Sequence, residues 1–357
     1  MPAVAPPPPP AYELLPAAGR VNHGAGMLAL DGAQLLVCWY SGASEAGRDV
    51  AIVCARSDRH GAWSAPRRVS RPGERDLGGA RAAKSVGNVA LARDRTGRLV
   101  MIQGEVQSRR VAGLETCRSW RCGRIAFRVS TDEGRTWSRP TRLDDRRGAL
   151  PRSRPLAVPG GDLVPVYREG GGAGVLRVDL AALEPGAPPA AQPIDMPGSA
   201  DLLQPSLVAM GGQVVAYLRD RRRRFVWASR LGPGASWSDP RPTNLPNPGS
   251  AVEAFGYAGR TALVYNPSRR DRRTLALAFS RDGLAFDAGC LLVPHGAAGD
   301  VAYPAVAETG DGVAVAVSIE GKRRIAVLRL ARAFLDACAA APLPGQAAAN
   351  MSSKFRR

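Results

Sequence analysis

One short fragment recurs along the chain and limits the folds that the chain can adopt. Its complete copy is Ser130–Trp137, which reads Ser-Thr-Asp-Glu-Gly-Arg-Thr-Trp. Three partial copies keep the same frame: Ser57–Pro66, Ser229–Pro240 and Ser280–Phe286, the last with Phe in place of Trp. Four copies of one fragment indicate a structural unit that is repeated along the chain.

The residue types of the fragment predict a tight turn between two strands. The Ser opens a loop, the Asp side chain accepts hydrogen bonds from backbone amides, and the Gly supplies a left-handed conformation. The aromatic residue then covers the hairpin. Such a hairpin cannot bury its own apolar face, so several must pack side by side, which predicts a closed radial array of small sheets.

Between these fragments, short apolar runs alternate with turn-forming residues. The chain holds 40 Gly and 30 Pro among 357 residues, which suits a globular protein rich in turns. Pairing the runs into hairpins predicts six blades, and so an all-β fold, a six-bladed β-propeller that forms one domain over residues 20–335. The expected blades span residues 20–72, 82–145, 150–195, 200–247, 250–294 and 298–335.

The two ends of the chain are predicted to lie outside this domain. Residues 1–19 contain five consecutive prolines, Pro6–Pro10, and are expected to form a disordered leader. Residues 336–357 are expected to form a C-terminal tail. A helical pattern occurs only over residues 327–341, where Pro342 would stop the helix.

The composition argues against membrane and nucleic-acid partners. No stretch approaches 18 uninterrupted apolar residues, and the opening residues lack the features of a secretory signal, which favours a cytoplasmic location. The net charge is +18, but 46 of the 49 basic residues are arginine, a skew that points to coding composition. Aromatic residues make up 6% of the chain and leave few stacking platforms for single strands. We therefore expect neither a membrane nor a nucleic acid as partner.

The cysteines and histidines show no regular spacing. Cys38 and Cys54 lie in apolar strand-like runs and are expected to be buried thiols. Cys117 and Cys122 could pair across a loop or stay reduced. None of the three histidines is spaced with another His or a Cys as a metal cluster requires, so we expect no metal and no cofactor.

The complete fragment Ser130–Trp137 resembles the Asp box of sialidases and of the wider family of sialidase-like (BNR repeat) β-propellers. Asp boxes are structural turns in the outer part of a blade, so this resemblance implies a sialidase-type propeller and not a particular chemistry. Five further segments carry the resemblance along the chain: Trp39–Glu45, Gln204–Ser206, Leu245–Pro248, Tyr265–Pro267 and Tyr303–Ala305.

The resemblance implies roles for individual residues. In sialidases three arginines clamp the substrate carboxylate, a Tyr assisted by a Glu is the nucleophile, and an Asp is the acid and base. Arg219 matches the second arginine and Arg272 the third. Tyr303 matches the nucleophile.

The chain departs from that pattern at several positions. His23 stands where the first arginine is expected, and a histidine at the start of a strand near the axis can act as a general acid or base. Gln204 stands near the place of the carboxylate that assists the nucleophile. The acid would be Glu45 or Asp49 in the loop of the first blade, although both carboxylates could equally cap that loop.

Two further residues are candidate sugar ligands. Glu169 follows a strand of the third blade and could supply a carboxylate, or it could form an ion pair with Arg168. Asn247 precedes a proline and could bind sugar or form a turn.

The sequence supports three hypotheses on one fold. The first is a monomeric exo-glycosidase acting on a sialoside or another acidic glycan, held by arginines in a central pocket. The second is a uronate polysaccharide lyase, or a hydrolase of another sugar, that uses His23 and Tyr303. The third is a glycan-binding propeller without catalysis.

Overall fold

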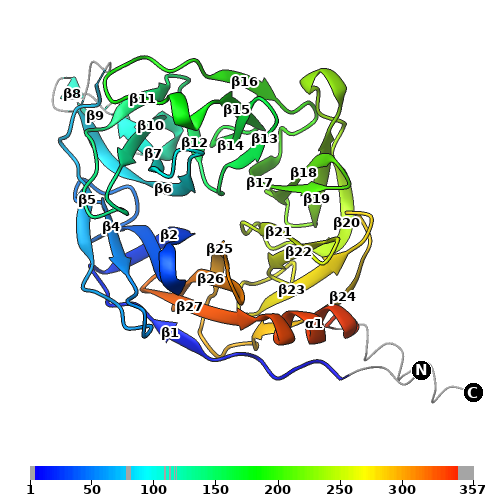
Figure 1. Ribbon diagram of the computed structural model, residues 1–357. Coiled ribbons are helices and arrows are strands. Elements are labelled where there is room, and N and C mark those ends of the chain that lie inside the picture. The colour runs from blue at the N-terminus through cyan, green and yellow to red at the C-terminus, as the bar shows by residue number, and fades with distance from the viewer. Residues whose placement is uncertain are drawn as a thin grey trace, which may run out of the picture.

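The computed structural model describes residues 5–77, 82–107, 110–111, 114–115, 117 and 119–344. Six small antiparallel sheets are arranged radially around a central axis (Figure 1). The prediction of an all-β, six-bladed β-propeller is confirmed. Each sheet begins with an inner strand at the axis and continues outward with its neighbours in the chain, so every blade is largely one local segment of sequence.

The blades are numbered 1 to 6 in chain order. Blade 1 contains β2 (Val21–Ala29), β3 (Leu35–Gly42), β4 (Ala51–Arg56) and β5 (Arg67–Ser70). Blade 2 contains β6 (Ala83–Arg93), β7 (Leu99–Gln107), β10 (Gly123–Ser130) and β11 (Thr141–Asp144). Blade 3 contains β12 (Ala149–Pro151), β13 (Leu156–Val158), β14 (Gly161–Arg168), β15 (Ala173–Val178) and β16 (Gln192–Asp195). Blade 4 contains β17 (Leu202–Met210), β18 (Gln213–Asp220), β19 (Phe225–Leu231) and β20 (Arg241–Pro246). Blade 5 contains β21 (Glu253–Tyr257), β22 (Arg260–Tyr265), β23 (Leu275–Ser280) and β24 (Phe286–Val293). Blade 6 contains β25 (Ala302–Thr309), β26 (Gly312–Ile319), β27 (Arg324–Ala331) and β1 (Tyr12–Leu14). Outside the blades lie the hairpin of β8 (Arg110–Val111) and β9 (Leu114–Glu115), four short 3₁₀ turns (Asp31–Ala33, Trp120–Cys122, Leu180–Ala182 and Pro233–Ala235) and the helix α1 (Arg332–Ala340).

The ring closes through the N-terminal segment. β1 pairs antiparallel with β27, with Tyr12 opposite Leu328, and so forms the outermost strand of blade 6. This pairing corrects the expectation of a disordered leader for residues 12–14. Three residues carry no local signal for a partner strand more than 300 positions away. Residues 1–4 lie outside the described part of the chain.

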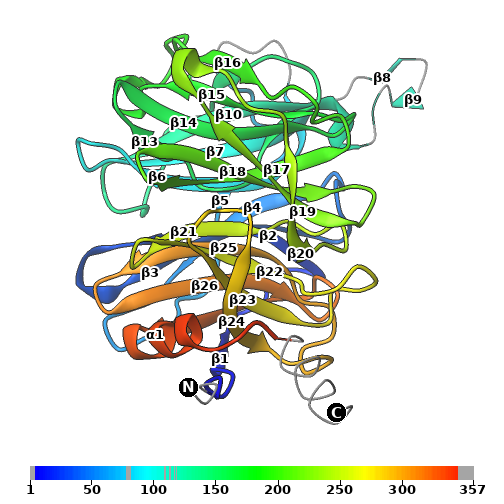
Figure 2. The ribbon, with the colours of Figure 1, turned by 90° about the vertical axis from the view of Figure 1, so that its right-hand side faces the viewer.

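The C-terminal segment also packs on the propeller. α1 begins at Arg332 and buries Leu335 and Cys338 in the apolar cluster shared by blades 5 and 6. Both views place α1 and β1 on the outer edge of the ring (Figure 1 and Figure 2). The expected tail therefore does not begin at residue 336, because the helix continues to Ala340; residues 345–357 lie outside the described part of the chain.

Four of the inner strands contain the same β-bulge. In β25, Ala302 lies opposite Ser318 and Ala305 opposite Ala316, so two residues face one on the partner strand. β2, β6 and β17 shift their register in the same way. The first bulge residue is left-handed in each case: Gly24 (φ 65°), Asn88 (φ 51°), Gln204 (φ 52°) and Tyr303 (φ 60°). A bulge re-aims a side chain, and a left-handed non-glycine residue stores strain that is characteristic of functional sites.

The recurring fragment forms the turn that its residue types predict. In the complete copy, the amide of Gly134 donates to Ser130 Oγ (2.9 Å) and that of Thr136 donates to Asp132 Oδ1 (2.8 Å). Gly134 has a φ of 75°. The Thr136 hydroxyl also donates to Asp132 Oδ2 (2.7 Å), and this bond, followed by that of the Thr136 amide, lowers the pKa of the Asp132 carboxyl to about 2. The fragment is thus a structural element at the blade turns.

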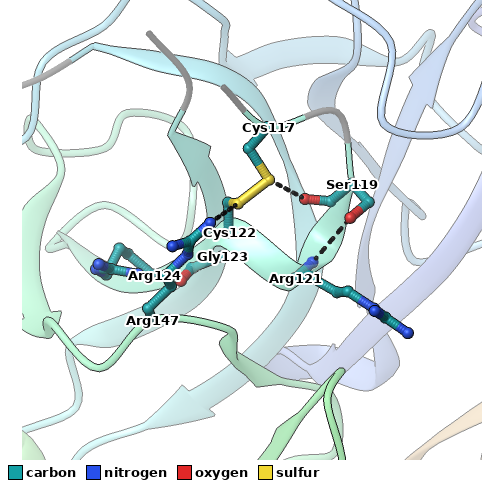
Figure 3. Close-up of a disulfide and its surroundings, with 7 residues drawn as sticks. All are labelled: Cys117, Ser119, Arg121, Cys122, Gly123, Arg124 and Arg147. Carbon is teal, nitrogen blue, oxygen red and sulfur yellow. Dashed lines mark hydrogen bonds between the residues drawn. A yellow bond between two sulfur atoms is a disulfide. The ribbon is translucent and has the colours of Figure 1, made fainter. Parts of the chain in front are cut away.

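The structure pairs all six cysteines, which corrects the expectation of buried thiols at Cys38 and Cys54. These two residues lie directly opposite each other on β3 and β4 and form a disulfide. Burial in an apolar run is common to thiols and disulfides, so the sequence pattern could not separate them. Cys117 and Cys122 pair within a loop, where Arg147 Nη2 donates to Cys122 Sγ at 3.2 Å (Figure 3). Cys290 of β24 pairs with Cys338 of α1.

Replacing both Cys290 and Cys338 with Ala should lower the free energy of unfolding by about 2–4 kcal/mol, because their disulfide closes a separation of 48 residues. Urea unfolding under oxidising conditions measures the change. The matched control replaces Cys117 and Cys122, whose separation is only five residues, and should cost less. Equal losses in the two variants would contradict this account.

Candidate active site

Polar and aromatic side chains from five blades converge at one end of the propeller axis. This end is formed by the starts of the inner strands and the ends of the second strands, because the two strands of each hairpin run antiparallel. Tyr303, at the bulge of β25, lies among them. Its hydroxyl oxygen accepts a hydrogen bond of 2.6 Å from Arg219 Nη1.

Cationic groups surround the ring of Tyr303. The guanidinium carbons of Arg152, Arg219 and Arg272 lie 5.5, 6.0 and 5.5 Å from the ring centroid. Burial by itself raises the pKa of the Tyr303 phenol, but the charges of Arg219, Arg272 and Lys322 together hold it below the ordinary value for tyrosine. The phenolate, which is the nucleophilic form, is thereby favoured.

His23 lies against Tyr303 but does not replace the charge of an arginine. The two rings meet edge to face with centroids 4.3 Å apart, and His23 Nδ1 lies 2.8 Å from Ser318 Oγ. Burial, followed by the nearby positive charges of Lys322 and Arg152, holds the pKa of His23 well below its ordinary value. The imidazole is therefore neutral at pH 7, and it can accept a proton from a bound ligand.

Arg219 is placed by the end of β18 and by its neighbours on β17 and β25. Its Nη1 also donates to Gln204 Oε1 at 3.1 Å, so Gln204 orients the arginine that bonds Tyr303. Arg219 Nε is buried and has no hydrogen-bond partner among the residues that the structure describes. The guanidinium thus keeps a donor for a further acceptor.

Arg272 lies in the loop between β22 and β23, and buried amides fix that loop. Asn266 Nδ2 donates to the carbonyls of Thr274 (2.7 Å) and Val301 (2.8 Å), which joins the loop to the segment before Tyr303. Arg272 Nη2 donates to the carbonyl of Gly249 at 2.8 Å. The side chain is only partly buried and remains open to a ligand.

The two candidate acids differ in their contacts. Glu45 accepts hydrogen bonds from Tyr40 Oη (3.1 Å) and Lys322 Nζ (2.5 Å), and the ring of Tyr40 lies 5.5 Å from that of His23. Asp49 instead accepts from the amide of Ala43 at 2.6 Å and caps the loop. Of the two, Glu45 is the one connected to the site.

Glu169 lies at the site, and Asn247 does not. Glu169 Oε1 accepts a hydrogen bond of 3.2 Å from the buried Tyr167, while Arg168 pairs with Asp195. Asn247 is fully buried, accepts from the amides of Gly249 and Ser250, and donates to the carbonyl of Ser250. Asn247 is therefore a turn former, as one reading of the sequence allowed. It fixes the segment whose Gly249 carbonyl holds Arg272.

Sequence reasoning missed Arg152, the arginine at the centre of the axis. Arg152 is 1% exposed and directly follows β12, the first part of the inner strand of blade 3. Arg152 stands directly after a short apolar run, at the position that corresponds to the bulge in the other blades. This position is the signal that could have identified it. That signal is weak in a chain with 46 arginines.

The described residues contain no group of three or more His, Cys, Asp or Glu side chains that could hold a metal ion. No helix in the described part of the chain is long and apolar enough to cross a membrane.

A second group of buried charges lies away from the axis, in blade 2. Glu105 Oε1 accepts from Gln103 Nε2 at 2.8 Å, and burial followed by the charge of Asp76 raises the pKa of Glu105 to about 7. Arg142 and Arg128 lower it in part. The folded protein thus binds this proton more tightly than the unfolded chain does.

Replacing Glu105 with Gln should therefore flatten the dependence of stability on pH. In the wild type, the contribution of the bound proton is complete below about pH 4 and is lost as the pH rises through about 7. This loss amounts to at most about 3 kcal/mol. Urea unfolding at about pH 5 and about pH 8 should show a larger fall in the wild type than in the variant. Equal falls would contradict the account.

Comparisons with known proteins support the fold. A family model described as "BNR repeat-like domain" matches residues 33–317. No curated protein matches the sequence. The intramolecular trans-sialidase from Ruminococcus gnavus, solved with oseltamivir carboxylate, is 12% identical with a TM-score of 0.69, and the match covers 92% of this chain and 98% of that one.

Two further structures are similar at the same level. The sialidase of Trypanosoma rangeli is 11% identical, with a TM-score of 0.65 over 90% of this chain and 56% of that one. A Dyadobacter fermentans protein of unknown function is 12% identical, with a TM-score of 0.65 over 89% and 98%. The match to the leech intramolecular trans-sialidase spans 65% of that enzyme's length. At these identities the likeness shows the fold alone.

Proposed function

The chain belongs to the sialidase-like BNR repeat family, and from this premise we propose that it is an exo-glycosidase that removes a sialic acid or another acidic sugar from a glycan. One observation carries the proposal: the Tyr303 hydroxyl lies 2.6 Å from Arg219 Nη1, within a group of arginines that favours its phenolate. A nucleophile and an anion-binding group thus share one position on the axis.

Arg219 and Arg272 bind the substrate carboxylate. Guanidinium groups suit this task because their parallel N–H donors match the two carboxylate oxygens. Arg219 keeps a buried, unpartnered Nε among the described residues, and Arg272 is partly exposed. The cationic surroundings also attract an anionic sugar from solution.

The Tyr303 phenolate then attacks the anomeric carbon. A bond forms between that carbon and the phenol oxygen, the glycosidic bond breaks, and the leaving oxygen takes a proton from Glu45. A water molecule next attacks the same carbon, gives its proton to Glu45 and returns the phenolate. Lys322 Nζ donates to Glu45 Oε2, so this contact must open before Glu45 carries the proton. The neutral Gln204 means that arginines, and not a carboxylate, activate Tyr303.

A second candidate is a uronate lyase, which the neutral His23 favours. Here the arginines neutralise the uronate carboxylate and His23 removes the proton on the adjacent carbon. The bond to the leaving oxygen breaks, that oxygen takes a proton from Tyr303, and a carbon–carbon double bond remains in the product. His23 is in the neutral form that can accept a proton, because burial and Lys322 hold its pKa well below the ordinary value.

Release of a fluorophore from a generic sialic-acid glycoside tests the first candidate. Purified wild type should release it, and Tyr303→Phe should not. A folded wild type without turnover would contradict the glycosidase, and uronate polysaccharides would then be screened for the absorbance of unsaturated products, with His23→Ala as the test variant. Saturable glycan binding without turnover in either assay would leave a binding propeller.

The disulfides bear on where the protein works. The sequence favours the cytoplasm, yet all six cysteines are paired, and disulfides persist in oxidising compartments. We therefore propose an oxidising compartment. Alkylation of the denatured protein, isolated from its own cells without reductant, should find no free thiol; free thiols would contradict this proposal.

A further inference from the structure

We propose that Arg152 is a positioning residue that fixes Tyr303 and His23 at the axis without touching the substrate. This inference rests on the proposed function of the same site. It assigns a task to the arginine that fills the centre of the propeller and that the reaction itself leaves unused.

Arg152 bonds the backbone of the two strands that carry the reacting groups. Its Nη1 donates to the carbonyl of Ala25 at 3.1 Å, and its Nη2 donates to the carbonyl of Pro304 at 2.9 Å. Ala25 and Pro304 are the second bulge residues of β2 and β25. One guanidinium from blade 3 therefore holds both bulges, one beside His23 and one beginning at Tyr303.

The burial of Arg152 and these contacts favour a role in holding the backbone over a role as a direct carboxylate ligand. Both terminal nitrogens of Arg152 already bond main-chain carbonyls, and the side chain is 1% exposed. The Tyr303 backbone is left-handed, a conformation that persists only when its surroundings hold it in place. Arg152 supplies one such contact at the Pro304 carbonyl, and a charged donor makes a strong hydrogen bond.

Glu253 balances the charge of Arg152. Glu253 is 1% exposed at the start of β21, and the two buried groups attract each other. Burial alone disfavours the charge on each of them: it raises the pKa of Glu253 and lowers that of Arg152, and each partner opposes this effect in the other. Removing one partner of such a buried pair leaves an uncompensated charge, which is strongly unfavourable.

A small cavity beside this pair completes the arrangement. It measures about 10 Å³ and is lined by Arg152, Ser153, Arg154 and Glu253 together with glycine and apolar residues. Arg152 Nε, Ser153 Oγ and Glu253 Oε2 are all buried and have no partner within the described residues. The volume and the three polar atoms fit one water molecule, which would accept from Arg152 and donate to the other two.

The titration of Tyr303 tests the proposal without any substrate. Ultraviolet absorbance of tyrosinate is followed against pH, and the Tyr303 signal is the difference between each protein and the same protein carrying Tyr303→Phe. The test variants are Arg152→Met and Arg152→Lys. The matched control is Arg222→Met, because Arg222 is largely exposed and pairs with Asp201.

Positioning predicts that Tyr303 ionises at higher pH in both Arg152 variants, by about one pH unit, because its hydroxyl leaves Arg219. Arg222→Met should titrate like the wild type. A pure charge effect would shift Arg152→Met and leave Arg152→Lys unchanged, and that result would overturn the proposal. If the wild type shows no turnover, the proposed function is wrong, but the titration still tests whether Arg152 positions Tyr303.

Glu253→Gln provides a second variant if the Arg152 variants fail to fold. Removing the negative charge of Glu253 would by electrostatics alone move the ionisation of Tyr303 to lower pH. Displacement of the unbalanced Arg152 moves it to higher pH, which is the result we expect. A shift to lower pH, or none, would overturn the proposal. In an active enzyme, Arg152→Lys should lower kcat about tenfold and change KM little.

Discussion

Replacing Tyr303 with Phe should lower kcat on an acidic glycoside by about a thousandfold or more, because the change removes the attacking oxygen. The ring that packs against His23 is retained, so the thermal unfolding temperature should stay close to that of the wild type. Steady-state kinetics and calorimetry of the same preparation measure both quantities.

Tyr257→Phe is the matched control. Its hydroxyl bonds the carbonyl of Arg332 and the carboxylate of Asp336 on α1, at the end of β21 opposite the site. This variant should keep full activity. Substantial turnover by Tyr303→Phe would show that another group attacks the substrate.

Replacing Arg219 with Met should lower kcat/KM by about a hundredfold to a thousandfold. The change removes a ligand of the substrate carboxylate and the donor to the Tyr303 hydroxyl. Loss of this positive charge raises the pKa of Tyr303, so the rise of activity that depends on its ionisation should move to higher pH. The profile of kcat/KM against pH measures the shift.

Arg222→Met is the control for Arg219. Arg222 lies three residues further along, is largely exposed, and pairs with Asp201 at 2.6 Å. Its loss removes the same charge from the chain but not from the site, so activity should stay near that of the wild type. Equal effects of the two variants would indicate that only net charge matters.

The fold could be predicted from the sequence because each blade is built from local hairpins. Turn chemistry at fragments such as Ser130–Trp137 specifies where strands reverse, and this information lies within a few residues. The closure of the ring by Tyr12–Leu14 could not be predicted in this way. Its partner β27 lies at the other end of the chain, and a three-residue strand has no periodicity of its own.

Most of the site could be predicted only where the resemblance named a residue, whereas Glu169 was proposed from its place after a strand of blade 3. Tyr303, Arg219 and His23 come together in the structure as expected. Arg152 escaped prediction because its environment depends on the convergence of blades 1, 3 and 6, which no local pattern records. Asn247 shows the converse, since the same Asn-Pro pattern serves a buried turn as well as a ligand.

The central claim is that Tyr303 forms a bond to the substrate's anomeric carbon, and covalent trapping tests it most directly. A fluorinated sialosyl fluoride, which forms the glycosyl-enzyme quickly and hydrolyses slowly, is incubated with the protein, and the intact mass and its peptides are measured. We predict one added sugar, located on Tyr303 and absent from Tyr303→Phe. An adduct on another residue, such as Glu45, or no adduct on the folded wild type, would contradict the account.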